Sequence, residues 1–492
     1  MSGAPTDVLD SSAAGSLIIR GGALRFASYI AVVALSVISA ALLTRYLGVA
    51  RFGHYTTVIS LVTVVSVVTD AGMSSLGTRE FAVREGAERE TLMRDLLGLR
   101  VVLTLLGVVL ATLFAALAGY DLALLAGTVV AGLATVALVL QHTLSIPLSA
   151  ELRLGALSLL DLARQALTVL ALVLLIVLHA GLFPLLAVTL VVYLLLMPAS
   201  IALARGRISL RMDLRPRRWA SLLRLTVAFS LATAVGTIYV YTTQILMSLV
   251  SNEHQSGLFA ASFRVYIVTA TVPGLLVSGA LPLLARAARD DRERLSYALQ
   301  RIFEVSLILG VATAIGLLAG AQFIVHVIAG PQFAGAAAVL RIQGIAMIAS
   351  FLIAGWGFGL ISTKRYGSLL VVNALAFAVS CALTLTLAPS HGARGAALAT
   401  VCGEAVLAGA LLIALVRSQP LFRPQLAILP KVALAAAPAV AIALLATGLS
   451  SLARALLALT AYALIVAATH AVPEEITEFI PRPLLHRRAP RG

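Results

Sequence analysis

The chain has 492 residues, of which 60% are hydrophobic and only 12% are charged, and it carries a formal net charge of +15. A mean hydropathy of +1.03 is too high for a soluble globular domain and is typical of a polytopic membrane protein. The basic excess therefore does not indicate nucleic-acid binding, because its meaning depends on where the charges lie. We expect no nucleic-acid partner.

Apolar stretches of about 20 residues, the length that crosses a bilayer as a helix, recur along the chain. They predict an all-α integral membrane protein with fourteen transmembrane helices. The predicted spans are 17–43, 55–73, 96–118, 122–146, 156–178, 183–204, 222–250, 258–284, 299–328, 334–361, 367–388, 395–416, 431–449 and 453–471. The first is too long for the apolar core of a cleaved signal peptide, so we expect it to be retained.

Basic residues outside the spans fall mainly on one side of the membrane when successive spans alternate in direction. The opposite side holds only Arg45, Arg51, Arg394 and Arg454. Because basic loops stay in the cytoplasm, this asymmetry predicts a multi-pass protein of the cell membrane with both termini in the cytoplasm. The predicted outer loops are too short for a folded domain, so we expect the protein to act within the membrane.

The longest basic loop, Arg205 to Arg218, divides the spans into six before it and eight after it. A short echo supports two halves, because the stretch 52–55 at the second span resembles the stretch 256–259 at the eighth. This predicts a parallel repeat of six spans. We expect an N-lobe at 1–204, a basic cytoplasmic linker at 205–221, a C-lobe at 222–416, two further spans within 417–471 and a cytoplasmic tail at 472–492.

Several arginines lie inside the predicted spans, where one near the bilayer centre costs roughly 2.5–3.5 kcal/mol. Four of them have simple explanations. Arg20, Arg224 and Arg301 lie near cytoplasmic ends, from which a long side chain reaches the headgroups. Arg164 and Arg301 also have Asp161 and Glu304 one helical turn away, which predicts local ion pairs.

Arg25 and Arg264 are harder to explain locally. Arg25 lies roughly 12 Å from the cytoplasmic end of its span, and Arg264 lies roughly 9 Å from the outer end of its own. The planar guanidinium suits phosphate oxygens. We therefore expect these two arginines, with Arg20 as a third candidate, to bind an anion in a central cavity.

Polar residues at steps of three and four mark one face of the first, second and seventh spans. Small polar residues also hold membrane helices together, but here the stripes coincide with arginines on matching spans of the two halves. We therefore expect a polar cavity. Its predicted lining residues are Ser28, Ser60, Thr63, Thr233, Thr237, Tyr241 and Gln244.

Acidic residues are rare inside the spans. Glu404 lies roughly 14 Å from the outer end of its span, and either pairs with Arg341 or is simply protonated; a coupling role is the alternative. Asp70 lies at a depth similar to Arg20 and Arg25 and could hold one of them until substrate displaces it. Asp70, Glu404 and Arg341 are thus candidates for coupling or gating.

The stretch from Leu42 to Ala82 resembles the N-terminal signature of Wzx-type polysaccharide flippases, of the multidrug/oligosaccharidyl-lipid/polysaccharide exporter (MOP) superfamily. It contains Leu47-Gly48, the stretch 52–55, Asp70-Ala71-Gly72 and Arg79-Glu80. Further similar blocks lie at 257–264, 330–341 and 392–400. The resemblance covers residues from about 15 to 416, nearly the whole chain.

The resemblance implies a flippase that moves an undecaprenyl-diphosphate-linked oligosaccharide from the inner to the outer leaflet, by alternating access of two lobes, for surface polysaccharide biosynthesis. Cationic cavity residues of such proteins lie on the first and eighth helices, which matches Arg25 and Arg264 here. Expected partners are the lipid-linked substrate, the bilayer, and a polysaccharide polymerase and glycosyltransferases.

Other functions remain open. A lipid II flippase is the nearest alternative, followed by a cation-coupled multidrug exporter, although the first span lacks the acid that such exporters often carry. A membrane glycosyltransferase is disfavoured by the short outer loops. No Walker A motif is present, so ATP hydrolysis is not expected. Cys381 and Cys402 fall within spans and predict no metal site. We expect neither an enzyme nor a cofactor.

Overall fold

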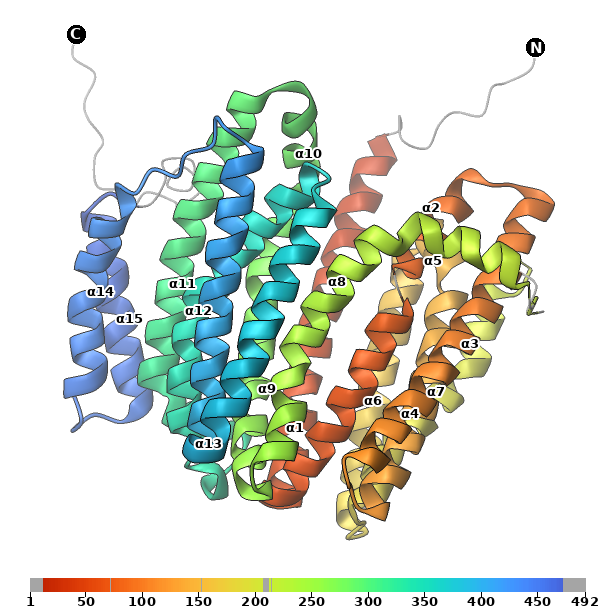
Figure 1. Cartoon of the computed structure of the whole chain (residues 1–492), viewed down its shortest axis with the longest axis horizontal. Coiled ribbons are helices and arrows are strands. Elements are labelled where there is room, and N and C mark those ends of the chain that lie inside the picture. The colour runs from red at the N-terminus through yellow and green to blue at the C-terminus, as the bar shows by residue number, and fades with distance from the viewer. Residues whose placement is uncertain (1–11, 71, 152, 207–211, 214, 472–492) are drawn as a thin grey trace. The chain divides into compact units, whose positions relative to one another are not determined.

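The computed structural model describes residues 12–70, 72–151, 153–206, 212–213 and 215–471. Within these ranges, the side chains at 12–27, 154, 225–230, 232–233 and 282 are not described. The predicted tail at 472–492 and part of the linker therefore lie outside the description. The described chain is helical and contains no strand, which confirms the predicted fold class (Figure 1).

The helices follow the predicted spans closely. They are α1 (Ser12–Asp70), α2 (Met73–Val83), α3 (Gly86–Leu117), α4 (Leu122–Leu144), α5 (Ile146–Ala150), α6 (Leu154–Val177), α7 (Leu182–Ala204), α8 (Pro216–Val250), α9 (Glu253–Ser278), α10 (Leu281–Asp290), α11 (Arg292–Ile328), the 3₁₀ turn η2 (Pro331–Phe333), α12 (Ala336–Ser362), α13 (Tyr366–Ser418), α14 (Ile428–Leu445) and α15 (Ser451–Ala468). Eleven of the described helices are long and apolar enough to cross a membrane.

Two long helices each cover a pair of predicted spans. Helix α1 contains a kink at Gly48 (φ 72°, ψ 178°), between the predicted spans 17–43 and 55–73. Helix α13 contains a kink at Gly392 (φ 55°, ψ −138°), between the predicted spans 367–388 and 395–416. A positive φ favours glycine, so the residue type specifies both turns. The grouping of the spans into six, six and two stays a prediction.

The predicted eighth span, 258–284, is wrong at its C-terminal end. Helix α9 ends at Ser278 and a separate helix, α10, begins at Leu281. The helix α10 buries Leu284 and Ala287 and exposes Leu283, so it is amphipathic. Its apolar residues extended the hydropathy signal beyond the end of the spanning helix.

The chain packs as two compact units. Unit 1 contains residues 1–261, 326–334 and 384–393, and unit 2 contains the rest. This places α8 with the first half of the chain, whereas the sequence boundary at 205–221 assigned it to the second lobe. The lobe boundaries therefore remain a prediction from the sequence.

Within unit 1, α4 packs against α3 and α7, and α1 packs against α6 and α8 (Figure 1). Next to α3 lies a hydrophobic cluster that includes Met73 and Phe81 of α2, Ile146 of α5 and Leu222 of α8. The short helices α2 and α5 and the start of α8 thus share one core.

Gly53 and Gly257, which belong to the two similar stretches 52–55 and 256–259, lie against each other in unit 1. A Cβ at Gly257 would lie 2.0 Å from the carbonyl oxygen of Val49, and a Cβ at Gly53 would lie 2.9 Å from the backbone nitrogen of Gly257. No other residue type fits such a backbone approach. The repeated glycine therefore has a direct physical role at the crossing of α1 and α9.

Neighbouring segments join the same crossing. The Thr44 hydroxyl donates a hydrogen bond to the carbonyl oxygen of Ile328 (2.9 Å), and the Gln332 amide donates to that of Arg45 (3.1 Å). The backbone nitrogen of Ala393 donates to Oε1 of Gln255 (3.0 Å). Segments far apart in sequence are thus held together at the kink of α1.

Unit 2 is built around α11 and α12. The rings of Phe303 and Trp356 stack with centroids 6.1 Å apart. The final helices α14 and α15 pack side by side (Figure 1). Helix α15 is joined to α11 by hydrogen bonds from Ser451 to the carbonyl of Ala319 (2.7 Å) and from Tyr462 to that of Ile308 (3.0 Å).

We predict that Gly257→Ala lowers the stability of the folded protein by about 1–3 kcal/mol, because the added methyl overlaps the backbone of α1. The melting temperature of the purified protein in detergent measures this. Gly274→Ala, in the same helix with no atom within 4 Å of the new methyl, is the matched control and should melt like the wild type. Equal melting of both variants would contradict the crossing.

Candidate functional site

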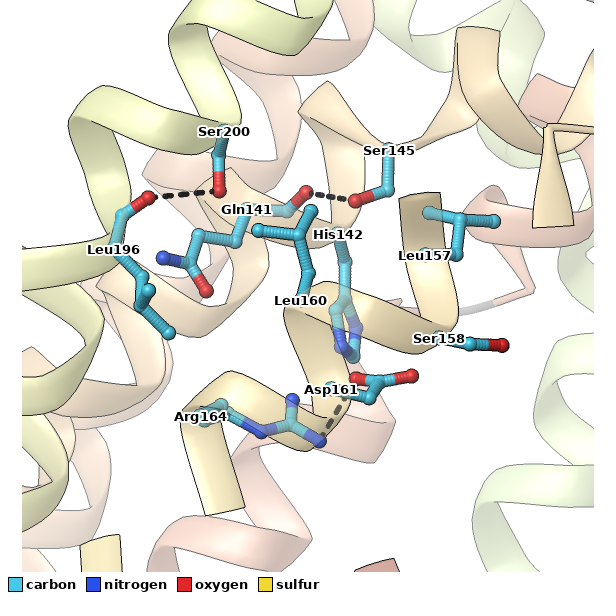
Figure 2. Close-up of a pocket in the computed structure, with 10 residues that line it drawn as sticks. All are labelled: Gln141, His142, Ser145, Leu157, Ser158, Leu160, Asp161, Arg164, Leu196 and Ser200. Atoms are coloured by element: carbon cyan, nitrogen blue, oxygen red, sulfur yellow. Dashed lines mark hydrogen bonds and ion pairs between the residues drawn. The ribbon is translucent and has the colours of Figure 1, made fainter. Parts of the chain in front are cut away.

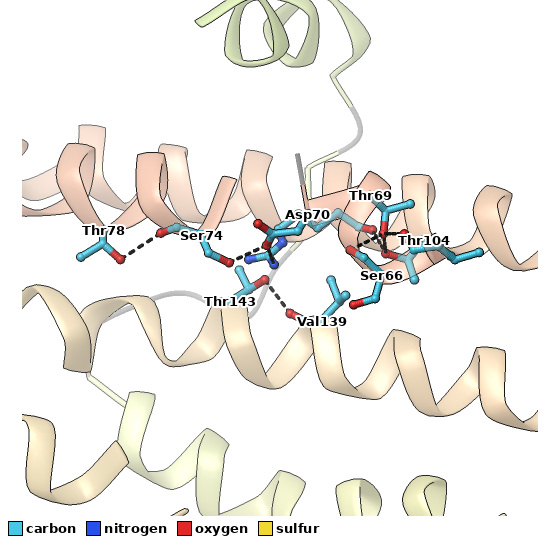
Figure 3. A network of polar contacts seen from close by, with 10 residues as sticks. Ser66, Thr69, Asp70, Ser74, Thr78, Thr104, Val139 and Thr143 are labelled. Atoms are coloured by element: carbon cyan, nitrogen blue, oxygen red, sulfur yellow. Dashed lines mark hydrogen bonds and ion pairs between the residues drawn. The ribbon is translucent and has the colours of Figure 1, made fainter. Parts of the chain in front are cut away.

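An ion pair between a buried arginine and a partly exposed aspartate joins α1 to α3 in unit 1. The Arg100 side chain is only 1% exposed, and its Nη2 donates to Oδ1 of Asp70. The Ser74 hydroxyl donates to the same carboxylate oxygen at 2.5 Å (Figure 3). Nearby, the hydroxyl of Thr104 donates to that of Thr69 at 3.2 Å. The pair therefore lies in a polar network among apolar helices.

Arg100 lies inside the predicted span 96–118, but the sequence analysis assigned it no partner. Helix α3 begins at Gly86 rather than near residue 96, so Arg100 lies about 21 Å along the helix. The polar first turns of α3 concealed this length, because hydropathy finds only the apolar part of a helix. The sequence analysis missed one signal. Asp70 has no basic residue within one helical turn of it, so a partner for its charge had to come from another helix.

The pair compensates most of the cost of burying Arg100. The Nε and Nη1 atoms of Arg100 have no hydrogen-bond partner among the described residues. Among these residues, the carboxylate of Asp70 therefore compensates the charge of Arg100. The sequence analysis suggested that Asp70 holds Arg20 or Arg25. Those two arginines lie in α1, but their side chains lie outside the described residues, and the gating role of Asp70 stays a prediction.

A polar cavity of about 180 Å³ lies between α4, α6 and α7. Figure 2 shows the ion pair of Asp161 and Arg164 in it, near His142. Nη2 of Arg164 lies 2.9 Å from Oδ1 of Asp161, which confirms the predicted local pair. The guanidinium also lies 5.8 Å from the ring centroid of Tyr193. A cavity of this size and polarity suits several water molecules.

The predicted cavity-lining residues have different environments in unit 1. Gln244 is fully buried, and its amide donates to the hydroxyls of Ser256 (3.2 Å) and Thr57 (3.5 Å), while its Oε1 has no partner in the described chain. Ser60 is also buried. Gln244 thus links α8 to both α1 and α9.

The remaining predicted lining residues are more accessible. Ser28, Thr63, Thr237 and Tyr241 are partly exposed, whereas the side chain of Thr233 lies outside the described residues. The Thr63 hydroxyl donates to the carbonyl of Ile59 at 2.7 Å, as Thr commonly does within a helix.

Glu404 lies in a hydrogen-bonded chain within unit 2. It is 6% exposed, and its Oε2 accepts a hydrogen bond from Ser350 (2.8 Å), which lies 3.1 Å from the hydroxyl of Tyr266. The described ion pairs do not join it to Arg341, which is partly exposed on α12. Glu404 thus connects α13, α12 and α9.

Two other predictions about arginines are settled. Nη1 of Arg301 lies 2.8 Å from Oε2 of Glu304, which confirms the predicted pair. Arg454, placed in an outer loop by the sequence analysis, is instead buried in the first turn of α15. Its Nη2 lies 3.4 Å from Oε1 of Gln322.

Arg264 is exposed on α9 in unit 2. Because α9 begins at Glu253 rather than at residue 258, Arg264 lies about 16 Å from the helix start. Its side chain is exposed on a helix that is apolar enough to cross a membrane.

The sequence matches the family described as "Polysaccharide biosynthesis protein" over residues 42–338, more than half of the chain. The chain belongs to this family. The match confirms the resemblance inferred from the sequence motifs, two of which, at 42–82 and 257–264, lie entirely inside it. No curated protein sequence matches the chain.

Solved structures with a similar fold are membrane transporters. The lipid II flippase MurJ in an inward closed conformation has a TM-score of 0.77 at 14% identity, with 93% of this chain and 100% of MurJ covered. An inward-facing multidrug resistance MATE transporter has a TM-score of 0.65 at 14% identity, covering 79% of this chain and 94% of its own. A MOP superfamily transporter from Pyrococcus furiosus has a TM-score of 0.57 at 12% identity, covering 82% and 96%.

The identities are low, so these structures establish the fold. The chain is therefore a member of the polysaccharide biosynthesis family whose fold resembles that of these membrane transporters. The substrate is a separate question.

We predict that Asp70→Ala destabilises the protein by about 3–5 kcal/mol, because it leaves the buried charge of Arg100 without its partner. Thermal unfolding in detergent, together with the yield of membrane-inserted protein, provides the measurement. Arg84→Ala removes a partly exposed pair with Glu80 one turn away on the same helix and should cost at most about 1 kcal/mol. An Asp70→Ala variant as stable as Arg84→Ala would contradict the compensating role of Asp70.

Proposed function

We propose that the protein flips an undecaprenyl-diphosphate-linked oligosaccharide from the inner to the outer leaflet of the cell membrane during surface polysaccharide biosynthesis. The family match over residues 42–338 carries this proposal, and the transporter fold supports it. The substrate has a charged headgroup and a lipid tail, so a carrier must offer positive charge within an apolar scaffold.

The diphosphate-binding residues in this proposal are Arg25 on α1 and Arg264 on α9, with Arg20 as a further contact. A guanidinium donates two parallel hydrogen bonds to a phosphate, which combines charge with orientation. The exposure of Arg264 supports this role, because its charge is accessible at a depth where lipid alone would be unfavourable.

The accessible striped residues supply hydroxyl groups for the headgroup and the first sugars. They are Ser28 and Thr63 of α1 and Thr237 and Tyr241 of α8. Asp70, Glu404 and Arg341 are the candidates for coupling or gating. In the proposed topology both termini are cytoplasmic, which matches a substrate made by glycosyltransferases on the inner face. A polysaccharide polymerase would receive the product outside.

We predict that Arg25→Ala and Arg264→Ala each abolish export of the polysaccharide, because each removes a ligand for the diphosphate. Surface polymer measured in a complemented deletion strain gives the readout, and membrane insertion is checked by immunoblot. Arg289→Ala changes an exposed arginine paired with Asp290 and should export normally. Normal export by either cavity variant would remove that residue from the proposed site.

The similarity to MurJ favours a second candidate, a lipid II flippase. The two functions differ in the process that depends on the protein. Depletion should stop surface polysaccharide formation while leaving cell-wall synthesis intact if the proposal is correct. Arrest of cell-wall synthesis with accumulation of lipid II would identify the second candidate instead.

We also predict that the membrane potential assists flipping. Moving one charge across 100 mV changes the free energy by about 2.3 kcal/mol, and an uncompensated diphosphate by roughly 4–5 kcal/mol. Proteoliposomes with an imposed potassium diffusion potential test this, with flipping of a fluorescent lipid diphosphate as the readout. A flipping rate that does not change with the sign or the size of the imposed potential would exclude the membrane potential as an energy source.

A further inference from the structure

A groove of about 480 Å³ lies between α10 and the start of α11, entirely within unit 2. Most of its lining is apolar and includes Leu283, Ala298, Ile302 and Val305. Its charged lining residues are Arg286, Asp290, Asp291, Arg294 and Arg301. None of these residues belongs to the site proposed for substrate.

The lining changes from polar to apolar along α11. Arg294 and Tyr297 lie in the first two turns, whereas Ile302 and Val305 lie further along the helix. From Arg294 to Val305 the helix rises about 16 Å. This matches the change from headgroups to acyl chains at one face of a bilayer, and Tyr297, which is exposed, is a residue type enriched at that boundary.

The acids of the groove are already engaged. Oδ1 of Asp290 lies 3.1 Å from Nε of Arg289, and Oδ1 of Asp291 accepts a hydrogen bond from the backbone nitrogen of Arg294 at 2.9 Å. The side chains of Arg286 and Arg294 form no ion pair with any residue in the described part of the chain. The backbone hydrogen bond leaves the charge on Asp291, so two arginines face one unpaired carboxylate and the polar end of the groove has an excess of positive charge.

The third arginine borders the groove from a fixed position. Arg301 is paired with Glu304 at 2.8 Å and lies 5.0 Å from the ring centroid of Tyr297. Its pairing neutralises it, so it shapes the groove without adding net charge. Arg286 and Arg294 remain as the two cations available to a ligand.

We propose that this groove binds an anionic phospholipid, with the phosphate between Arg286 and Arg294 and one acyl chain along Ile302 and Val305. Charge complementarity selects an anionic headgroup, and the apolar floor requires a lipid rather than a free anion. Basic pockets at the cytoplasmic ends of membrane helices commonly hold such lipids. The site would stabilise the amphipathic helix α10 against α11.

The experiment compares the full-length protein in detergent with and without added phosphatidylglycerol, measuring the melting temperature and, by native mass spectrometry, the number of bound lipids. A ligand that binds only the folded state raises its stability. The wild type should gain stability and retain bound phosphatidylglycerol. The double variant Arg286→Ala/Arg294→Ala should lose at least half of the shift and at least one bound lipid.

Arg292→Ala is the matched control, because Arg292 lies on the same helix as Arg294 but does not line the groove. It should respond to phosphatidylglycerol like the wild type. An equal response of the double variant would overturn the proposal, as would equal stabilisation by phosphatidylcholine or by inorganic phosphate alone. Stabilisation by undecaprenyl phosphate but not by phosphatidylglycerol, through the same two arginines, would reassign the groove to substrate and also overturn it.

Discussion

The cost of placing a charged group among apolar helices governs this structure. Each buried or membrane-embedded charge must be paired, hydrated or offered to an anion, and the described arginines show these solutions separately. Arg100 is buried and compensated by Asp70, and Arg164 is paired beside a polar cavity. Arg264 is exposed on α9, so its side chain is accessible to a ligand.

The same constraint separates structural polar groups from functional ones. Gln244 and Ser60 were expected to line a cavity, yet both are buried, and Gln244 joins three helices. Thr237 and Tyr241, further from that junction, stay partly exposed. One polar stripe thus serves packing at one end and accessibility at the other, and spacing alone does not distinguish the two.

Much of the fold could be predicted, because hydropathy reports directly on the length of helix that a bilayer accepts. Residues 122–144 and 182–204 became α4 and α7 almost as expected. The position of Arg100 along α3 could not be predicted, since hydropathy does not distinguish the polar first turns of a helix from a loop. The site was even harder to predict than the fold. Local pairs such as Arg164 with Asp161 follow from helical spacing, but the partner of Asp70 lies 30 residues away in the sequence.

The crossing of Gly53 and Gly257 also constrains the order in which the helices of the protein assemble. The kink region of α1 emerges from the ribosome early, yet its partners come much later, as in the hydrogen bond between Thr44 and Ile328 over 284 residues. Such distant contacts form late. The first helix must therefore wait in the membrane, incompletely packed, until α9 and the segments around η2 and Gly392 have been inserted. The N-terminal unit completes its assembly only when most of the chain has been synthesised.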